Sequence, residues 1–460
     1  MILHNVEELM GRLFGTDGAR GVAITELTCE TAMNIGRAAA IVLTKHKTAG
    51  TKAKILIGKD TRVSSDILEA ALISGIMSVG ADAVLLGVVP TPAVAYLVKQ
   101  QDADAGVMIS ASHNSVEYNG IKLFAGTGFK LPDEVENEIE ALILDNPELM
   151  TLKEGTEVGR VAVLDDAAGL YISHLAECAD IGAKELRVVA DCANGSSSAT
   201  ARRLFDTLGV DCDIINAEPD GTNINEKCGS THIDRLQEKV KEGGYDLGVA
   251  FDGDADRCLA VDEKGRLVDG DRLIAVISGN MKSKGILKKD TAVVTVMSNL
   301  GFHTYMKEHG ISTVCTSVGD RYVLEEMLKS GYNIGGEQSG HIIFLDHATT
   351  GDGQLTAVKL ISMLSGTDRK LSQYKDEFPD YPQLLINVKI TPENKGMWDK
   401  NDTILASIKE AEEALGSDGR VLVRESGTEP LVRVMIEGKD AQKVELYTNK
   451  IADTIKAQFC

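Results

Sequence analysis

Short apolar runs alternate with amphipathic segments through the first three quarters of the chain. The runs that predict buried strands are Lys54–Gly58, Ala83–Gly87, Gly106–Ser110, Arg187–Asp191, Asp246–Phe251 and Ala292–Val296. Near-continuous apolar strands joined by helices indicate parallel or mixed sheets that are covered on both faces. The pattern therefore predicts α/β domains over most of the chain.

The segments between these runs predict helices. The helix after the first run is expected to begin at Ser65 and to end at Gly80. Its core-facing side is predicted to consist of Ile67, Ala70, Ala71 and Ser74. Another helix is expected after Pro90-Thr-Pro.

The C-terminal part of the chain has a different pattern. An alternating segment, Leu384–Ile390, is followed by a helix over 403–415, the strands Arg420–Val423 and Val432–Ile436, and a helix from Asp440. This βαββα order predicts a small α+β domain. With boundaries expected near 155, 256 and 372, the four predicted domains are 1–155, 156–256, 257–372 and 373–460.

Composition restricts the classes of partner. The chain has 48 Lys and Arg against 69 Asp and Glu, a formal net charge of −21, which argues against nucleic acid and against an anionic membrane. No apolar run reaches the roughly 20 residues of a membrane span, and the N-terminus does not resemble a signal peptide. The eight cysteines lack metal-ligand spacing. We expect a cytoplasmic protein with reduced thiols.

The most distinctive acidic segment is Asp252-Gly-Asp-Ala-Asp-Arg257, directly after an apolar strand. If the strand geometry continues, Asp252, Asp254 and Asp256 project to one side. Three adjacent carboxylates repel one another unless a cation neutralises them, and hard oxygen ligands suit Mg²⁺ or Ca²⁺. A calcium loop needs glycine at its sixth position, where this chain has Arg257, even though Glu263 falls at the twelfth. An acidic turn in water remains the simpler alternative.

A turn of small polar residues follows the apolar run Gly106–Ser110, and it contains a candidate nucleophile. Ser112 has His113 beside it and Lys122 ten residues further on, and such a serine can be activated by a neighbouring base. A serine-rich turn that only binds its own backbone would have the same composition.

Three further loops have compositions suited to polar ligands. The segment Arg424–Pro430, with Arg433 beyond it, can bind an anion through successive N–H groups, hydroxyls and guanidinium groups, or form a plain hairpin. The segment Gly335–His341 suits a polyhydroxylated ligand, or a surface loop. Arg20 lies in the glycine-rich turn Gly15–Gly21, which is neither a dinucleotide fingerprint nor a P-loop.

These five segments, taken in their order along the chain, resemble those of the α-D-phosphohexomutase superfamily. The resemblance extends from Gly15 to Gly438. Members have three related α/β domains with mixed sheets and a smaller C-terminal α+β domain, in a heart-shaped arrangement with a central active site. The strings Phe14–Gly21, Asn223–His232, Val318–Val323 and Gly336–His341 are most similar to the bacterial phosphoglucosamine mutase branch. Gln338 stands where phosphomannomutase/phosphoglucomutase relatives more often have Met.

The resemblance implies a mechanism that begins with an activating phosphorylation of Ser112. The phosphoserine, with Asp252, Asp254 and Asp256, would hold one Mg²⁺ and pass its phosphoryl group to glucosamine 6-phosphate through glucosamine 1,6-bisphosphate. The glucosamine 1-phosphate formed would feed UDP-N-acetylglucosamine and cell-wall synthesis.

The resemblance also implies the roles of the other site residues. Arg20 would offset phosphoryl charge, His113 would assist, and Lys122 would move the proton, which requires a lowered pKa. The remaining site residues are Glu337, Ser339 and His341 for the sugar, Arg424, Ser426, Gly427, Thr428 and Arg433 for the non-reacting phosphate, and Arg257 without an assigned role.

One departure and three alternatives accompany this interpretation. Ser115 replaces the proline usual after Ser-His-Asn, so the turn loses a fixed φ but no reacting group. The same machinery could serve a phosphomannomutase or phosphoglucomutase, a sugar-phosphate sensor without catalysis, or a hydrolase. A homodimer is left open by the sequence.

Overall fold

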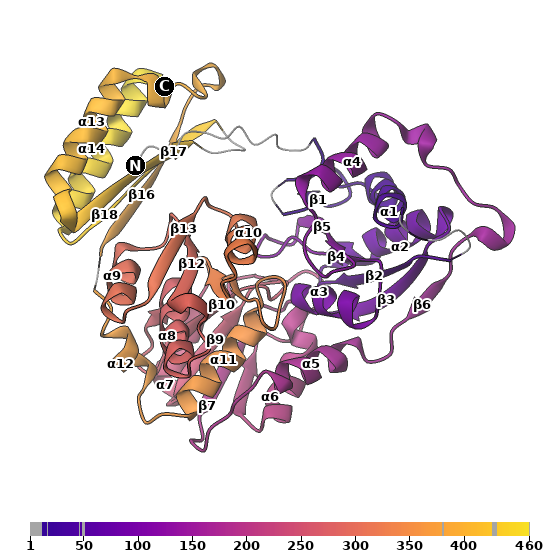
Figure 1. The fold of residues 1–460 in the computed structure, drawn as a ribbon, viewed down its shortest axis with the longest axis horizontal. Coiled ribbons are helices and arrows are strands. Elements are labelled where there is room, and N and C mark those ends of the chain that lie inside the picture. The colour runs from indigo at the N-terminus through magenta and orange to yellow at the C-terminus, as the bar shows by residue number, and fades with distance from the viewer. Residues whose placement is uncertain are drawn as a thin grey trace. The chain divides into compact units, whose positions relative to one another are not determined.

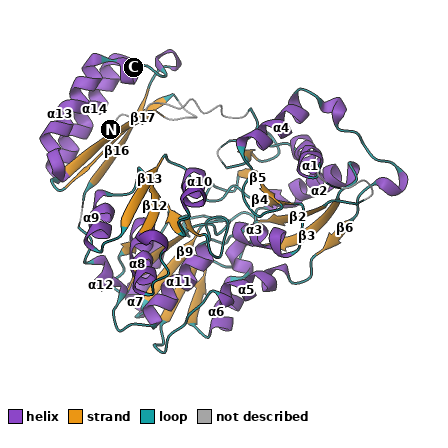
Figure 2. Ribbon diagram, viewed as in Figure 1, coloured by secondary structure: helices purple, strands orange, loops and turns teal. Residues whose placement is uncertain are grey.

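The computed structural model describes residues 12–15, 17–45, 47, 51–379, 381–425 and 430–459 (Figures 1 and 2). The chain divides into two compact units. One contains the described residues of 11–297 and 310–376, and the other contains 298–309 and the described residues from 377 onward. Within the described ranges, no helix combines the length and the apolar character that crossing a membrane requires.

The first sheet of the larger unit has six strands in the order β1-β5-β4-β2-β3-β6. Their bounds are β1 Ala19–Val22, β2 Lys54–Lys59, β3 Asp82–Val88, β4 Ala105–Ile109, β5 Tyr118–Ala125 and β6 Val161–Val163. The pairs β1–β5 and β5–β4 are antiparallel and the others parallel. The helices are α1 Cys29–Leu43, α2 Val63–Ser78, α3 Thr91–Gln100 and α4 Asp133–Leu144.

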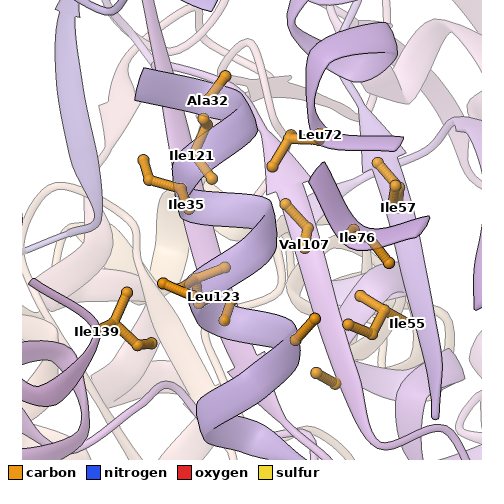
Figure 3. Packing of buried hydrophobic residues seen from close by; sticks show 14 of the residues in the cluster. Ala32, Ile35, Ile55, Ile57, Leu72, Ile76, Val107, Ile121, Leu123 and Ile139 are labelled. Atoms are coloured by element: carbon orange, nitrogen blue, oxygen red, sulfur yellow. The ribbon is translucent and has the colours of Figure 1, made fainter. Parts of the chain in front are cut away.

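Helices cover both faces of this sheet. Figure 3 shows the face covered by α1, α2 and α4, where the buried cluster includes Ile35, Leu72, Ile139 and the strand residues Ile57 and Val107. On the other face the strands carry glycine, because α3 packs very close. A Cβ on Gly106 would lie 2.5 Å from Val98 Cγ2, and one on Gly58 would lie 2.6 Å from Val94 Cγ2.

The predicted core face of α2 is wrong. Ile67 is 47% exposed, whereas Leu68, Leu72 and Ile76 are fully buried. The helix is apolar on several sides, so more than one stripe has helical spacing. Gly75 decides between them, because a Cβ there would lie 2.0 Å from the Met33 carbonyl oxygen of α1. The close crossing of the two helices therefore fixes the stripe beside Gly75 as the buried one.

The second sheet has the order β11-β10-β9-β7-β8 and the third the order β13-β12-β14-β15. The second contains β7 Arg187–Asp191, β8 Asp211–Ile215, β9 Leu247–Phe251, β10 Cys258–Asp262 and β11 Leu267–Val268, with α5 Ala167–Glu177, α6 Ala201–Leu208 and α7 Asp234–Gly243. The third contains β12 Thr291–Thr295, β13 Ser312–Thr316, β14 Ile334–Gly336 and β15 Ile342–Phe344, with α8 Gly270–Ser283, α10 Asp320–Ser330, α11 Gly353–Ser365 and α12 Leu371–Lys375. Both sheets are mixed, as the sequence predicts.

The smaller unit contains the predicted C-terminal α+β domain. Its antiparallel sheet has the order β16-β18-β17, formed by β16 Gln383–Lys389, β17 Gly419–Glu425 and β18 Leu431–Gly438. The helices α13 Asp402–Leu415 and α14 Ala441–Phe459 bury one apolar cluster with this sheet, and α9 Leu300–Glu308 belongs to the same unit. The βαββα order is confirmed.

Candidate functional site

Ser112 lies in the turn that follows the buried strand β4. Its backbone has a φ of 51°, in the left-handed region that residues other than glycine seldom adopt. The Ser112 N–H donates to the Ser110 hydroxyl at 3.0 Å, and that hydroxyl donates to Asp60 at 2.7 Å. Ser112 is only 1% exposed. Ser112 is thus held in the interior, although the turn reaches the surface by Ser115.

The three aspartates follow strand β9, but the strand does not continue through them. Residues 252–256 form a turn in which Ala255 has a φ of 55°. The expectation of strand alternation is therefore wrong, although the turn does bring the carboxylates of Asp252, Asp254 and Asp256 together. One oxygen of each lies within 4.8 Å of the others. Glu263 instead accepts hydrogen bonds from Ser372, unlike the last ligand of a calcium loop.

The serine turn and the aspartate turn are in direct contact. The Ser112 hydroxyl donates to Asp252 Oδ2 at 2.6 Å. Gly253 permits this approach, because a Cβ at that position would lie 2.5 Å from the Ser112 carbonyl oxygen. The candidate nucleophile therefore adjoins the carboxylate cluster, in the arrangement that the resemblance implies.

The electrostatics of the cluster are those of a cation site. Burial, together with the charges of Asp256 and Asp254, raises the pKa of Asp252. Asp254 Oδ1 and Asp256 Oδ1 are buried without a hydrogen-bond partner. Unpartnered buried carboxylate oxygens are costly, and hard divalent cations accept such ligands. The donor set therefore fits Mg²⁺.

Lys122, on β5, lies against the same carboxylates. Its Nζ is 2.8 Å from Asp254 Oδ2, 3.0 Å from Asp17 Oδ2 and 3.5 Å from Asp256 Oδ2. Burial alone would lower the pKa of the amine, but the charges of Asp17, Asp254 and Asp256 raise it well above its ordinary value. The expectation of a lowered pKa is thus contradicted. In this arrangement Lys122 is a cation that can donate hydrogen bonds.

His113 lies beside the serine. Its Nδ1 lies 3.5 Å from Ser112 Oγ. Burial, followed by the charges of Arg257 and Arg20, lowers the pKa of His113 to about 4. The imidazole is therefore neutral near pH 7 and only a weak proton acceptor.

Charged residues that the sequence did not single out extend the site. Asp17 forms ion pairs with Arg20 and Lys122, and Lys130 bridges Asp17 at 2.7 Å and Asp320 at 2.5 Å. Asp17 and Asp320 lie in two sequence segments quoted above, Gly15–Gly21 and Val318–Val323. Their place in these segments is the sequence feature that could have identified them. Lys130 carried no sequence signal.

His341 joins this network to the aspartates. Its Nδ1 is 3.6 Å from Asp256 Oδ2 and its Nε2 is 3.4 Å from Asp320 Oδ2. The Gly351 N–H donates to Nε2 at 3.0 Å, which leaves the proton of a neutral ring on Nδ1, facing Asp256. The loop residue His341 therefore contacts the site that contains Ser112.

In the rest of the segment Gly335–His341, Gly335 and Gly336 belong to β14, and the Gly340 carbonyl oxygen accepts a hydrogen bond from the Cys258 N–H, just beyond the aspartate turn. Burial raises the pKa of Glu337, with the charge of Arg257 acting against it. The Arg257 Nε is buried without a hydrogen-bond partner, 3.9 Å from Asp256 Oδ1. Ser339 is exposed, and the Gln338 amide lies 3.5 Å from Asp269 Oδ2. Glu337 and Arg257 thus supply a carboxylate and a cation beside the cluster.

The candidate phosphate residues lie in the smaller unit. Arg424 on β17 and Arg433 on β18 are directly opposite each other in the sheet. Burial and the charge of Arg433 lower the pKa of Arg424, and Arg433 Nε is buried without a hydrogen-bond partner. Two facing cations repel unless an anion lies near. Ser426, Gly427 and Thr428 lie outside the described residues.

The chain matches four domain families along its length. Their descriptions are "Phosphoglucomutase/phosphomannomutase, alpha/beta/alpha domain I" for residues 11–150, domain II for 170–265, domain III for 269–381, and "C-terminal domain" for 385–454. The sequence is 53% identical over 450 residues to a phosphoglucosamine mutase of Clostridium perfringens, covering 98% of this chain and 100% of the relative. It is 51% identical over 450 residues to one of Brevibacillus brevis, with the same coverage.

Solved structures share the fold at low sequence identity. A phosphoglucomutase/phosphomannomutase family protein of Burkholderia thailandensis superposes with a TM-score of 0.81 at 23% identity, covering 98% of both chains. An N-acetylphosphoglucosamine mutase of Aspergillus fumigatus, solved with GlcNAc-6P and magnesium, has a TM-score of 0.72 at 19% identity, covering 97% of this chain and 96% of the other.

Proposed function

The chain belongs to the phosphoglucomutase/phosphomannomutase family, and we propose that it interconverts glucosamine 6-phosphate and glucosamine 1-phosphate through a phosphoserine at Ser112. The observation that carries the chemistry is the Ser112 hydroxyl, 2.6 Å from a buried cluster of three carboxylates. The amino-sugar substrate rests on the relatives, which match along their full length and are phosphoglucosamine mutases.

The first transfer passes the phosphoryl group to the sugar. The free 1-hydroxyl of glucosamine 6-phosphate attacks the phosphorus, the new O–P bond forms, and the bond between phosphorus and Ser112 Oγ breaks. The proton of the sugar hydroxyl leaves to a base, the departing Ser112 oxygen takes up a proton, and glucosamine 1,6-bisphosphate results. After the bisphosphate turns over, Ser112 Oγ attacks the 6-phosphate, its own proton leaves, and the sugar 6-oxygen is protonated. The enzyme regains its phosphoserine, so neither water nor a net phosphate is consumed.

The residues around Ser112 supply the electrostatics of these transfers, which depend mostly on positioning and charge stabilisation. Asp252, Asp254 and Asp256 would hold one Mg²⁺, which supplies positive charge to the transferring group when bound. Arg20 and Lys122 add positive charge on the chain itself. His113 lies 3.5 Å from Ser112 Oγ and assists there, while the serine proton is directed at Asp252, and Lys122 returns a proton to the sugar oxygen.

The remaining candidates bind the substrate. Glu337, Ser339 and His341 recognise the sugar, with Arg257 beside Glu337. The facing pair Arg424 and Arg433, with Ser426, Gly427 and Thr428, binds the phosphate that does not react. A sugar with phosphate at both ends can satisfy one such site in either orientation, so a single phosphate site serves both transfers.

Parallel assays of glucosamine, glucose and mannose 6-phosphates test the substrate. We expect the highest kcat/KM with glucosamine 6-phosphate, because the full-length relatives quoted above are phosphoglucosamine mutases. A higher kcat/KM for glucose or mannose 6-phosphate would assign the activity to the other branch of the family. Binding without turnover would indicate a sensor, and release of inorganic phosphate as the main product would indicate a hydrolase.

Arg424→Ala should weaken the phosphate site without touching the chemistry at Ser112. A charge-assisted hydrogen bond contributes about 1.5–3 kcal/mol, so kcat/KM should fall roughly tenfold to a hundredfold. The variant should also release more glucosamine 1,6-bisphosphate, and added bisphosphate should partly restore the rate by rephosphorylating Ser112. Steady-state kinetics and quantification of the released bisphosphate measure both effects.

The matched control for Arg424→Ala is Lys450→Ala. It removes a cation of the same unit whose partner is Glu410 on the surface, and it should leave kcat/KM unchanged. Equal kcat/KM for Arg424→Ala and wild type, with no extra bisphosphate, would mean that the arginine pair does not bind the phosphate.

A further inference from the structure

Arg62 is a buried cation whose hydrogen bonds converge on the serine turn. Its side chain has no exposure and forms an ion pair with Asp60 through Nε at 2.8 Å. Nη2 donates to the carbonyl oxygens of Ser112 at 3.0 Å and Asn114 at 2.8 Å. Nη1 donates to two more carbonyl groups, at residues 115 and 118. All five side-chain N–H donors are thus engaged within the protein, so Arg62 is not available to bind a ligand.

Asn225 reaches the same two carbonyl groups from the second α/β region. Its Nδ2 donates to Ser112 O at 2.9 Å and to Asn114 O at 3.0 Å. Asn225 is 6% exposed and has a φ of 59°, a conformation that asparagine tolerates better than most residues. It belongs to the string Asn223–His232, whose residues have had no role in the account so far.

We propose that Arg62 and Asn225 are positioning residues that fix the Ser112 hydroxyl for phosphoryl transfer. Each of the two carbonyl groups accepts one hydrogen bond from Arg62 and one from Asn225. Ser112 is held in a left-handed conformation that persists only where its surroundings enforce it. This inference rests on the proposed function, in which Ser112 Oγ must keep one position while it gives a phosphoryl group away and takes it back.

Arg62 also contacts the turn at the position of the missing proline. Ser115 has no ring to fix its φ, but its carbonyl oxygen accepts a hydrogen bond from Arg62 Nη1. The arginine therefore restrains the turn from inside the protein. Asn225 lies beyond β8 and Ser112 beyond β4. The hydrogen bonds of Asn225 therefore also join the serine turn to the region that supplies the aspartates.

The test uses two variants of the full chain. Asn225→Gly removes the amide donors and keeps the left-handed backbone accessible. Arg62→Lys keeps the charge but replaces a planar fork with a single ammonium group, which cannot reach all four carbonyl groups. Their controls are Lys227→Gly, an exposed residue of the same loop with a φ of 52°, and Arg37→Lys, whose Nε donates to Ser78 Oγ in α2.

The first measurement is the rate at which glucosamine 1,6-bisphosphate phosphorylates Ser112, followed by intact-protein mass. The others are kcat and KM, the affinity for Mg²⁺, and thermal unfolding. A misplaced nucleophile costs up to about a hundredfold, so both variants should phosphorylate Ser112 roughly tenfold to a hundredfold more slowly than wild type. KM and Mg²⁺ affinity should stay within about twofold, and both controls should match wild type. A general loss of structure would change both quantities, so a slower transfer with an unchanged KM is not expected from it.

Two outcomes would contradict the inference. Wild-type transfer rates in Asn225→Gly and Arg62→Lys would overturn the inference. A rise in KM with a fall in Mg²⁺ affinity and stability, each in proportion to the loss of rate, would also overturn it. If Arg62→Lys does not fold, Asn225→Gly decides alone. Failure of the wild-type protein to accept a phosphoryl group would overturn the proposed function, and this inference with it.

Discussion

Ser112→Ala is expected to abolish mutase activity while the protein remains folded. The variant lacks the oxygen that receives and returns the phosphoryl group, and removing a covalent nucleophile lowers kcat by roughly 10⁴-fold or more. The hydroxyl makes one hydrogen bond to a charged acceptor, Asp252, whose loss costs about 1.5–3 kcal/mol at most. No cavity opens in the apolar core, because only an oxygen is removed. Coupled assays of mutase activity and thermal unfolding measure the two effects.

Ser115→Ala is the matched control for Ser112→Ala. Ser115 lies in the same turn and its side chain is exposed, so its loss should leave activity and stability unchanged. Intact mass should show phosphorylated protein in wild type and in Ser115→Ala, and none in Ser112→Ala. Mutase activity in Ser112→Ala above one hundredth of the wild-type value would refute the phosphoserine mechanism.

Removal of the divalent cation should have a comparable effect. Excess chelator is expected to stop turnover, and Mg²⁺ should restore it better than Ca²⁺, which prefers more ligands at longer distances. Mg²⁺ should also stabilise the folded protein, by about 2.7 kcal/mol at a hundred times its Kd. Activity after readdition and the shift of Tm with Mg²⁺ concentration measure these effects.

Asp254→Asn links the cation to the carboxylate cluster. The substitution removes one charge from the set of three carboxylates within 4.8 Å, so Mg²⁺ affinity should fall roughly tenfold to a hundredfold or more. The shift of Tm with Mg²⁺ should shrink accordingly. Asp206→Asn, at an exposed position of α6, should behave as wild type. Full activity in chelator, or an undiminished Mg²⁺ shift in Asp254→Asn, would exclude the cluster as the metal site.

The pattern of the sequence was sufficient for the sheets and for the C-terminal domain. Runs such as Arg187–Asp191 are apolar throughout because they are covered on both faces, and they coincide with observed strands. The pattern failed on α2, where Ile67 was placed in the core. Periodicity gives the spacing of a stripe, but the choice between two stripes depended on Gly75 against the Met33 carbonyl of α1, a contact between residues far apart in the chain.

The candidate site was predictable where its residues are consecutive. The spacing of Asp252, Asp254 and Asp256 indicated a cation site, and the structure brings them together, although through a turn. The pKa of Lys122 was expected to be lowered and is raised. The direction of this pKa shift depends on Asp17, which is more than a hundred residues from the aspartates in sequence. Arg62 and Asn225 act on backbone carbonyl groups, and no motif in a single sequence records such a contact.

A single-turnover experiment with labelled phosphoserine tests the central claim most directly. The protein would be prepared with ³²P on Ser112 and mixed with Mg²⁺ and one equivalent of unlabelled glucosamine 6-phosphate. If the phosphoryl group passes through Ser112, the label should appear at the 1-position of glucosamine 1-phosphate, and Ser112 should retain an unlabelled phosphate taken from the sugar. Formation of glucosamine 1-phosphate with all of the label still on the protein would contradict the account.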